Sequence, residues 1–129
     1  MSLIKPHGSD ELNPLFVYDT AQNEALQKEA EGLTSIVVSS ATAANAVMLG
    51  GGYFNPLTGY MNKADALSVA KDMKTTSGLF WPVPILNLVK DAGKIKPGDR
   101  IALKDPNVEG NPILAVMDVK AVEEFSDAD

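Results

Sequence analysis

The stretch GGGYFNPLTGYM, residues 50–61, combines sharp turning with large apolar side chains. Glycine or proline occupies five of its twelve positions, and both residue types are typical of turns. Asparagine suits the first position of a turn and proline the second, which predicts a turn beginning at Asn55-Pro56. The apolar side chains of this glycine-proline segment must be buried, either within the same domain or against a neighbouring domain. The candidates for docking on a neighbouring domain are Tyr53, Phe54, Pro56, Leu57, Tyr60 and Met61.

The three consecutive glycines also invite comparison with a phosphate-binding loop. The Walker pattern needs a Gly-Lys-Ser/Thr step at the start of a helix, so that the lysine and backbone N–H groups reach phosphate oxygens. Here the next lysine is Lys63, eleven residues beyond Gly52, and the G-x-G-x-x-G pattern is absent as well. The triplet instead indicates the end of a helix, where a left-handed residue is favourable only for glycine.

Three helices are predicted around this segment, over residues 19–30, 41–49 and 62–74. The second is apolar nearly all round, which is typical of a helix that is buried or lies at an interface. In the third, Leu67, Ala70 and Met73 are spaced by three and form the predicted inward face. Each helix begins at a side chain that accepts hydrogen bonds from free backbone N–H groups, namely Asp19 or Thr20, Ser39 or Ser40, and Asn62.

Four strands are predicted, over residues 35–39, 79–89, 100–103 and 113–119. Pro82 and Pro84 lie two apart in the second strand, so their missing N–H groups face the same neighbour. That strand is therefore placed at a sheet edge or at a barrel opening. Pro97 and Gly98 occupy the central positions of a predicted type II turn. Helices in the first part of the chain and strands mainly in the second indicate an α+β domain with a small, mostly antiparallel barrel.

Composition limits the function. A length of 129 residues fits one domain, and no cysteine is present, which excludes disulfides, thiolate metal sites and a cysteine nucleophile. The net charge is −6, and the ten lysines are scattered among carboxylates, which disfavours binding to a phosphate backbone. No apolar run reaches the roughly 20 residues of a membrane helix. The expected location is the cytoplasm.

The residues capable of chemistry are few. His7 is the only histidine and is interpreted as a surface or packing residue, because neither a triad nor a histidine-rich metal site can be built around it. Trp81 is interpreted as a core residue rather than a base-stacking one. The hydroxyl groups of Ser39, Ser40 and Thr42 are interpreted as helix caps rather than as an anion site. No catalytic, cofactor-binding or metal-binding residue is assigned.

Several motifs resemble the beginning of ATP sulfurylases (sulfate adenylyltransferases). Residues 4–8, IKPHG, are similar to the opening KPHGG of that family, with Ser9 in place of the second glycine. The glycine-proline segment is similar to the family's GG(G)-[FY]-x-PL-x-G-[FY]-M run. Asn55 stands where the family usually has serine or alanine.

Further motifs follow in the order of the family. Residues 77–85, SGLFWPVPI, resemble GLPWPIPI, and residues 96–103 with 110–116 resemble the hairpin GDRVAL…G-x-P-x-A. The resemblance covers nearly all of the chain and treats residues 1–129 as a single domain that ends in a linker. It implies an N-terminal PUA-like domain, a small and mostly antiparallel β-barrel with N-terminal helices.

The resemblance also implies the reaction of the whole enzyme, in which ATP and sulfate give adenylyl sulfate and pyrophosphate, or the reverse. In that family, catalysis belongs to a following domain with Q-x-R-N-P, H-x-x-H and G-R-D-H motifs, none of which occurs here. The chain alone is therefore expected to be inactive. Its expected partner is the catalytic domain of the same enzyme, through which ATP, as Mg-ATP, and sulfate would bind. Formation of a homo-oligomer through the parent enzyme is a further expectation.

Two alternatives belong to other functional classes. A stand-alone PUA-like module that binds RNA is suggested by the fold analogy alone, and the acidic balance argues against it. An independent enzyme would need a site that the motifs do not reveal. The sequence leaves open whether the parent enzyme serves sulfate assimilation or sulfur oxidation.

Overall fold

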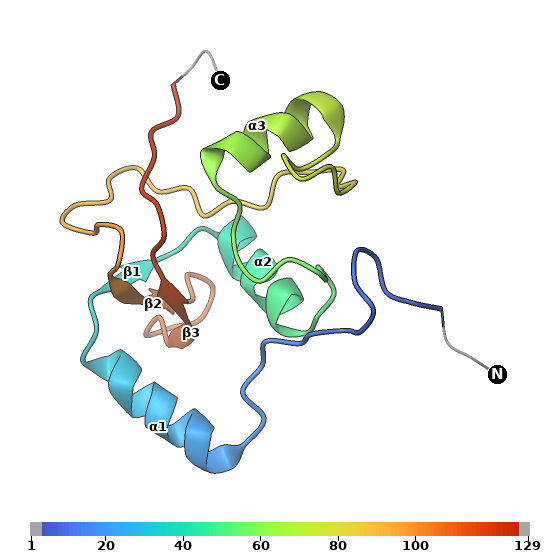
Figure 1. The fold of residues 1–129 in the computed structure, drawn as a ribbon. Coiled ribbons are helices and arrows are strands. Elements are labelled where there is room, and N and C mark those ends of the chain that lie inside the picture. The colour runs from blue at the N-terminus through green and yellow to red at the C-terminus, as the bar shows by residue number, and fades with distance from the viewer. Residues whose placement is uncertain (1–3, 127–129) are drawn as a thin grey trace.

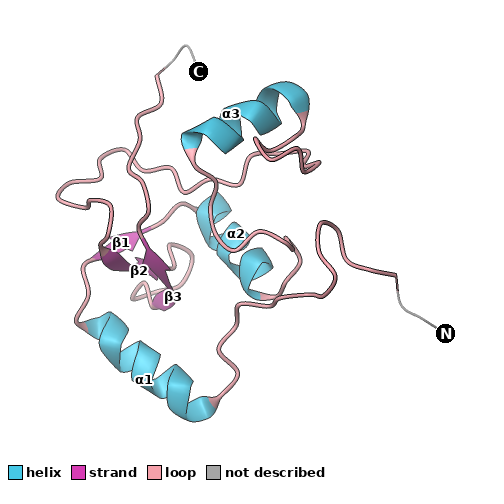
Figure 2. Ribbon diagram, viewed as in Figure 1, coloured by secondary structure: helices cyan, strands magenta, loops and turns pink. Residues whose placement is uncertain are grey.

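The computed structural model describes residues 4–126 (Figures 1 and 2). Within that range it contains three helices and one three-stranded sheet. The elements in chain order are α1 (Thr20–Glu31), β1 (Ser35–Val37), α2 (Ser40–Gly50), α3 (Lys63–Asp72), β2 (Arg100–Lys104) and β3 (Ile113–Asp118). In Figure 1, α1 and α3 lie at opposite ends, with α2 and the sheet between them. The predicted α+β class is confirmed.

The sheet has the order β1-β2-β3. β1 pairs with β2 in parallel, with Ser35 opposite Ala102, and β2 pairs with β3 antiparallel, with Arg100 opposite Asp118. α1 contacts β2 and β3, and α2 contacts β3. The predicted barrel, mostly antiparallel, is wrong for the described residues: the sheet is open, and one of its two pairings is parallel.

The strand predicted over residues 79–89 is also wrong. This segment makes only one isolated bridge, between Lys74 and Phe80. Its carbonyl groups instead accept hydrogen bonds from side chains and from backbone N–H groups just before and after α3: Ile85 O from Met61 N at 2.7 Å, for example. Pro82 and Pro84 have no N–H to donate, so the segment cannot make the regular series of backbone hydrogen bonds that would pair it with a neighbouring strand.

The predicted helix starts are confirmed. Asp19, Ser39 and Asn62 each precede a helix, and each side chain accepts a hydrogen bond from the N–H three residues later. Gly32 forms the C-cap of α1. The type II turn is confirmed as well, since Asp99 N donates to Lys96 O at 3.1 Å and the intervening glycine has a φ of 95°.

The predicted inward face of α3 is wrong. Ala66 and Val69 are the buried residues of this helix, whereas Ala70 and Met73 are exposed. The helix ends at Asp72, and Met73 then adopts a left-handed conformation with a φ of 54°. The Met73 side chain therefore does not lie on the inward face, where it would lie if the helix continued.

The core consists of two clusters joined by α2 and Tyr60. The sheet-side cluster contains Val38, Ala43, Ile101, Leu103 and Val119. The helix-side cluster contains Leu49, Val69, Trp81 and Ile85. Tyr60 packs against both clusters, and α2 contributes Ala43 to one and Leu49 to the other. Among residues 4–126, no helix is both long and apolar enough to cross a membrane.

Candidate interdomain docking site

The glycine triplet closes α2 with two hydrogen bonds. Gly51 is the C-cap, and Gly52 follows it in the left-handed region with a φ of 81°. The N–H of Tyr53 donates to Met48 O at 3.0 Å, and the N–H of Gly52 donates to Leu49 O at 3.2 Å. These bonds, to carbonyl groups five residues and three residues back, are the Schellman pattern. The triplet is therefore a helix stop, as the missing lysine step predicted.

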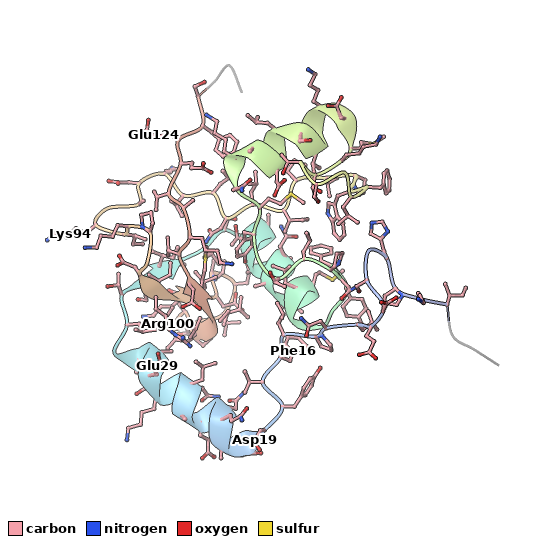
Figure 3. The ribbon with its side chains drawn as sticks, in the orientation of Figure 1. Phe16, Asp19, Glu29, Lys94, Arg100 and Glu124 are labelled. Atoms are coloured by element: carbon pink, nitrogen blue, oxygen red, sulfur yellow. The ribbon has the colours of Figure 1, made fainter. Side chains whose placement is uncertain are left out.

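The bare backbone of the triplet is covered by aromatic rings. A Cβ atom added to Gly50 would overlap the ring of Phe16, and one added to Gly51 would lie 2.8 Å from the ring of Tyr53. The carbonyl oxygen of Gly50 also accepts hydrogen bonds from Leu15 N at 2.7 Å and Phe16 N at 3.0 Å. The N-terminal segment thus crosses the end of α2, where Figure 3 labels Phe16.

The turn itself is shifted from its predicted position. Leu57 N donates to Phe54 O at 2.8 Å, which places Asn55 second and Pro56 third in the turn. The Asn55-Pro56 peptide bond is cis. The prediction of asparagine first and proline second is therefore wrong, because a cis proline occupies the third position of a tight turn.

Asn55 is buried and ties the N-terminal segment to the turn. Its Oδ1 accepts from Asn13 N at 3.1 Å, and its Nδ2 donates to His7 O at 3.2 Å and to Ser9 Oγ at 2.7 Å. Sequence reasoning missed this contact. The signal was present, since Asn55 and Ser9 are the two positions at which these motifs depart from the family pattern, and their side chains bond to each other.

The six candidate docking residues divide into two groups. Tyr53 is 76% exposed, and Pro56 is half-buried beside Gly8, where an added Cβ would lie 2.8 Å from the proline ring. The ring of Phe54 meets that of Trp81 edge-on at a centroid distance of 5.7 Å. The candidates that pack against the helix-side cluster are Phe54, Leu57, Tyr60 and Met61.

The hydroxyl group of Tyr60 is protonated and hydrogen-bonded. Its hydroxyl group donates to the carbonyl oxygen of Thr42 at 2.8 Å. Burial raises the pKa of Tyr60 to about 12, because removal from water disfavours the phenolate. At neutral pH Tyr60 is therefore a neutral donor that links the glycine-proline segment to α2.

A model of the PUA-like domain family matches residues 4–129. The chain belongs to this PUA-like domain family. It is 63% identical over 129 residues to a sulfate adenylyltransferase from Alcanivorax borkumensis, a match that covers 100% of this chain and 32% of that protein. A sulfate adenylyltransferase from Allochromatium vinosum is 63% identical over 126 residues, covering 98% and 32%. The chain thus spans about a third of the length of the curated relatives it matches.

Among solved structures, this PUA-like domain is similar to part of a protein named as a hexameric APS kinase from Thiobacillus denitrificans. The TM-score is 0.78 with 31% sequence identity, and the match covers 97% of this chain and 24% of that chain. Together with the two sulfate adenylyltransferases, it confirms the family resemblance drawn from the ordered motifs.

The remaining candidates in the PUA-like domain have structural roles. His7 Nε2 donates to Phe80 O at 2.7 Å, and its ring packs near those of Phe80 and Trp81. Trp81 is buried, as predicted. Ser39 caps α2, and Thr42 Oγ1 donates to the carbonyl oxygen of a neighbouring loop at 3.4 Å.

The single arginine of the PUA-like domain is paired with carboxylates. Arg100 Nε lies 3.1 Å from Glu29 Oε1, and its Nη1 lies 3.7 Å from Asp118 Oδ1 (Figure 3). These contacts join β2 to α1 and to β3. In the part of the chain that the structure describes, no group of three or more metal-ligating side chains is present.

Proposed function

We propose that this PUA-like domain is the N-terminal part of a sulfate adenylyltransferase, which forms adenylyl sulfate and pyrophosphate from ATP and sulfate, or runs the reverse reaction. The observation that carries the proposal is 63% identity across the whole chain to two enzymes of that name. The chain accounts for 32% of their length, which leaves room for a catalytic portion. A cytoplasmic location is part of this proposal.

Within such an enzyme, the domain would have a structural role. Attack of a sulfate oxygen on the α-phosphorus needs cationic groups that stabilise the developing charge. In this domain, the one arginine is paired with Glu29 and Asp118, and the one histidine is bonded to a backbone carbonyl. ATP, as Mg-ATP, and sulfate would therefore bind to the catalytic portion, which is also the proposed partner.

The proposed contact with that catalytic portion is centred on Tyr53. This side chain is the exposed member of the candidate set and covers Gly51, while the ring of Phe16, which covers the preceding Gly50, is 47% exposed. Aromatic side chains on a backbone fixed by a helix cap offer a rigid apolar contact, the kind of anchor that is common at interfaces. The proposal replaces docking by Phe54 and Leu57, which pack inside the domain.

A domain exchange tests the function. In the Alcanivorax borkumensis enzyme, the segment that matches this chain would be replaced by residues 1–129, and pyrophosphate release from ATP and sulfate would be measured. We expect the chimera to retain activity and the isolated chain to have none. A folded chimera without activity would count against the proposal, as would activity of the highly purified isolated chain. Reading the coding sequence beyond Asp129 is a simple additional check, because a catalytic portion should follow.

None of the relatives described above is named for binding nucleic acid. The RNA-binding alternative therefore has no observation in its favour, and the net charge of −6 opposes it.

A further inference from the structure

Residues 120–126 follow β3 without forming a helix or a strand, yet they are held at the start of α3 (Figure 1). Three contacts of this segment involve Lys63. Its backbone N–H donates to Glu123 Oε2 at 2.7 Å, and its Nζ donates to Glu124 O at 2.7 Å. The same Nζ lies 5.4 Å from the centroid of the Phe125 ring. Figure 3 labels Glu124 on this segment.

The contact with Glu123 satisfies a specific need of the helix. Lys63 is the first residue of α3, and the first N–H groups of a helix have no acceptor within the helix. Asn62 accepts from Asp65 N, so the cap residue serves one of these groups and leaves that of Lys63 to another acceptor. A carboxylate is favoured here because the helix N-terminus carries partial positive charge.

The other end of the segment is fixed to the turn before β2. Val119 is buried, its N–H donates to Asp99 O at 2.8 Å, and its carbonyl oxygen accepts from Gly98 N at 2.7 Å. Between Val119 and the contacts with Lys63 the chain has no regular secondary structure and its side chains are exposed. The segment is thus attached at both ends and spans from the sheet to α3.

We propose that residues 120–126 form a strap, which Lys63 clasps to the start of α3, and that this clasp sets the direction in which the chain leaves the domain. Each of three successive strap residues contributes a different interaction to the same lysine: a carboxylate, a backbone carbonyl and an aromatic face. In a longer enzyme, the clasp would hold the following segment next to α3, a consequence that rests on the proposed function. The strap itself does not.

The test uses the 129-residue chain and two matched variants. Glu123→Ala removes the carboxylate acceptor, whereas Glu124→Ala leaves the backbone carbonyl that Lys63 Nζ contacts. Amide hydrogen exchange of Lys63 reports the clasp directly, because its N–H is bonded to Glu123. Heteronuclear NOE values at Val122 and Phe125 report the mobility of the strap.

In Glu123→Ala, we expect the Lys63 amide to exchange about tenfold faster, the equivalent of one charged hydrogen bond, and the NOE values at Val122 and Phe125 to fall. Glu124→Ala should match the unsubstituted protein. The Val69 amide, within α3, should be equally protected in all three proteins, which shows that the helix persists. The proposal is overturned if Lys63 exchange is the same in Glu123→Ala, or if Phe125 in the unsubstituted protein already has the NOE of a free chain end. Neither result depends on sulfate adenylyltransferase activity, so the two proposals fail separately.

Discussion

Gly52 is the residue at which the chain leaves α2, and its φ of 81° is accessible mainly to glycine. A Cβ added there would lie 3.5 Å from Pro14, an ordinary contact, so substitution by alanine changes the backbone energy and little else. We expect Gly52→Ala to lower the free energy of unfolding by about 1–2 kcal/mol, the cost of a left-handed residue with a side chain. Urea denaturation measures the difference.

Gly59→Ala is the matched control for Gly52→Ala. No atom lies within 4 Å of the Cβ position at Gly59, and its φ is not in the left-handed region. The control should therefore be neutral or slightly stabilising, since alanine restricts the unfolded chain. Equal effects of the two substitutions would show that the left-handed cap does not determine the stability of this segment.

The bond between Asn55 and Ser9 predicts an energetic coupling. Asn55→Ala would leave the N–H of Asn13 without its acceptor, so we expect a loss of about 2–3 kcal/mol of unfolding free energy. Ser9→Gly should cost about 1 kcal/mol in the unsubstituted protein and much less in the Asn55→Ala background. A double-mutant cycle by denaturant unfolding measures this coupling. Additive effects would mean that the two side chains do not interact in solution.

The stability of the domain should depend on pH in the alkaline range because of Tyr60. Its pKa is about 12 in the folded protein, against the ordinary tyrosine value of 10.0, because burial disfavours the phenolate. The unfolded chain therefore loses this proton first, so the stabilising contribution is complete below about pH 10 and declines as the pH rises to about 12. The unfolding free energy should fall more steeply over this range than in Tyr60→Phe. Parallel curves for the two proteins would contradict the prediction.

Among the larger elements, the segment over residues 79–89 is the one whose behaviour differs most from its sequence pattern. Its apolar side chains suit a strand, but its hydrogen bonds run to α3 and the turn after it, with Trp81 N donating to Met73 O at 2.9 Å. We expect the Trp81 amide to exchange slowly and that of Val83 to exchange fast, in contrast to the uniformly protected amides of β2. Hydrogen exchange followed by NMR measures this. Continuous protection from 79 to 89 would restore the predicted strand.

The helix boundaries could be predicted because their signals are local. Asp19, Ser39 and Asn62 each accept a bond from an N–H three residues away, and the left-handed Gly52 closes α2 through bonds within a few residues. The caps needed no knowledge of the rest of the chain. The same reasoning failed for Met73, because the sequence did not show that α3 ends at Asp72, two residues before the predicted end.

The sheet could not be predicted to the same degree, since its pairing is decided between distant residues. β1 lies beside β2 in parallel, with Ile36 opposite Leu103, and no local pattern specifies that partner. The sequence predicted a strand over residues 113–119 but not its neighbour. The candidate site divides in the same way: the segment was found by its composition, whereas the inward orientation of Phe54 and Leu57 follows from tertiary packing.

At the scale of the whole molecule, the two sides of the glycine-proline segment have different surroundings. Inward, its apolar side chains complete the helix-side cluster, and Tyr60 also reaches the sheet-side cluster. Outward, Tyr53 and Phe16 lie on the capped end of α2. A partner that binds this outer side would contact a surface supported by both clusters, which makes the contact rigid.

Substitution of Tyr53 separates docking from folding. The catalytic portion of the Alcanivorax borkumensis relative would be produced separately, and its binding to this domain measured by calorimetry. We expect Tyr53→Ala to weaken binding about tenfold or more, as for an aromatic anchor, with less than 0.5 kcal/mol lost in unfolding free energy.

Leu57→Ala should instead destabilise the domain by about 1–3 kcal/mol, because its side chain packs on the helix-side cluster. Val108→Ala, at a side chain 48% exposed in the loop between β2 and β3, is the surface control and should leave both quantities unchanged. Unaltered binding of a folded Tyr53→Ala domain would move the docking surface elsewhere, since no other member of the candidate set is as exposed.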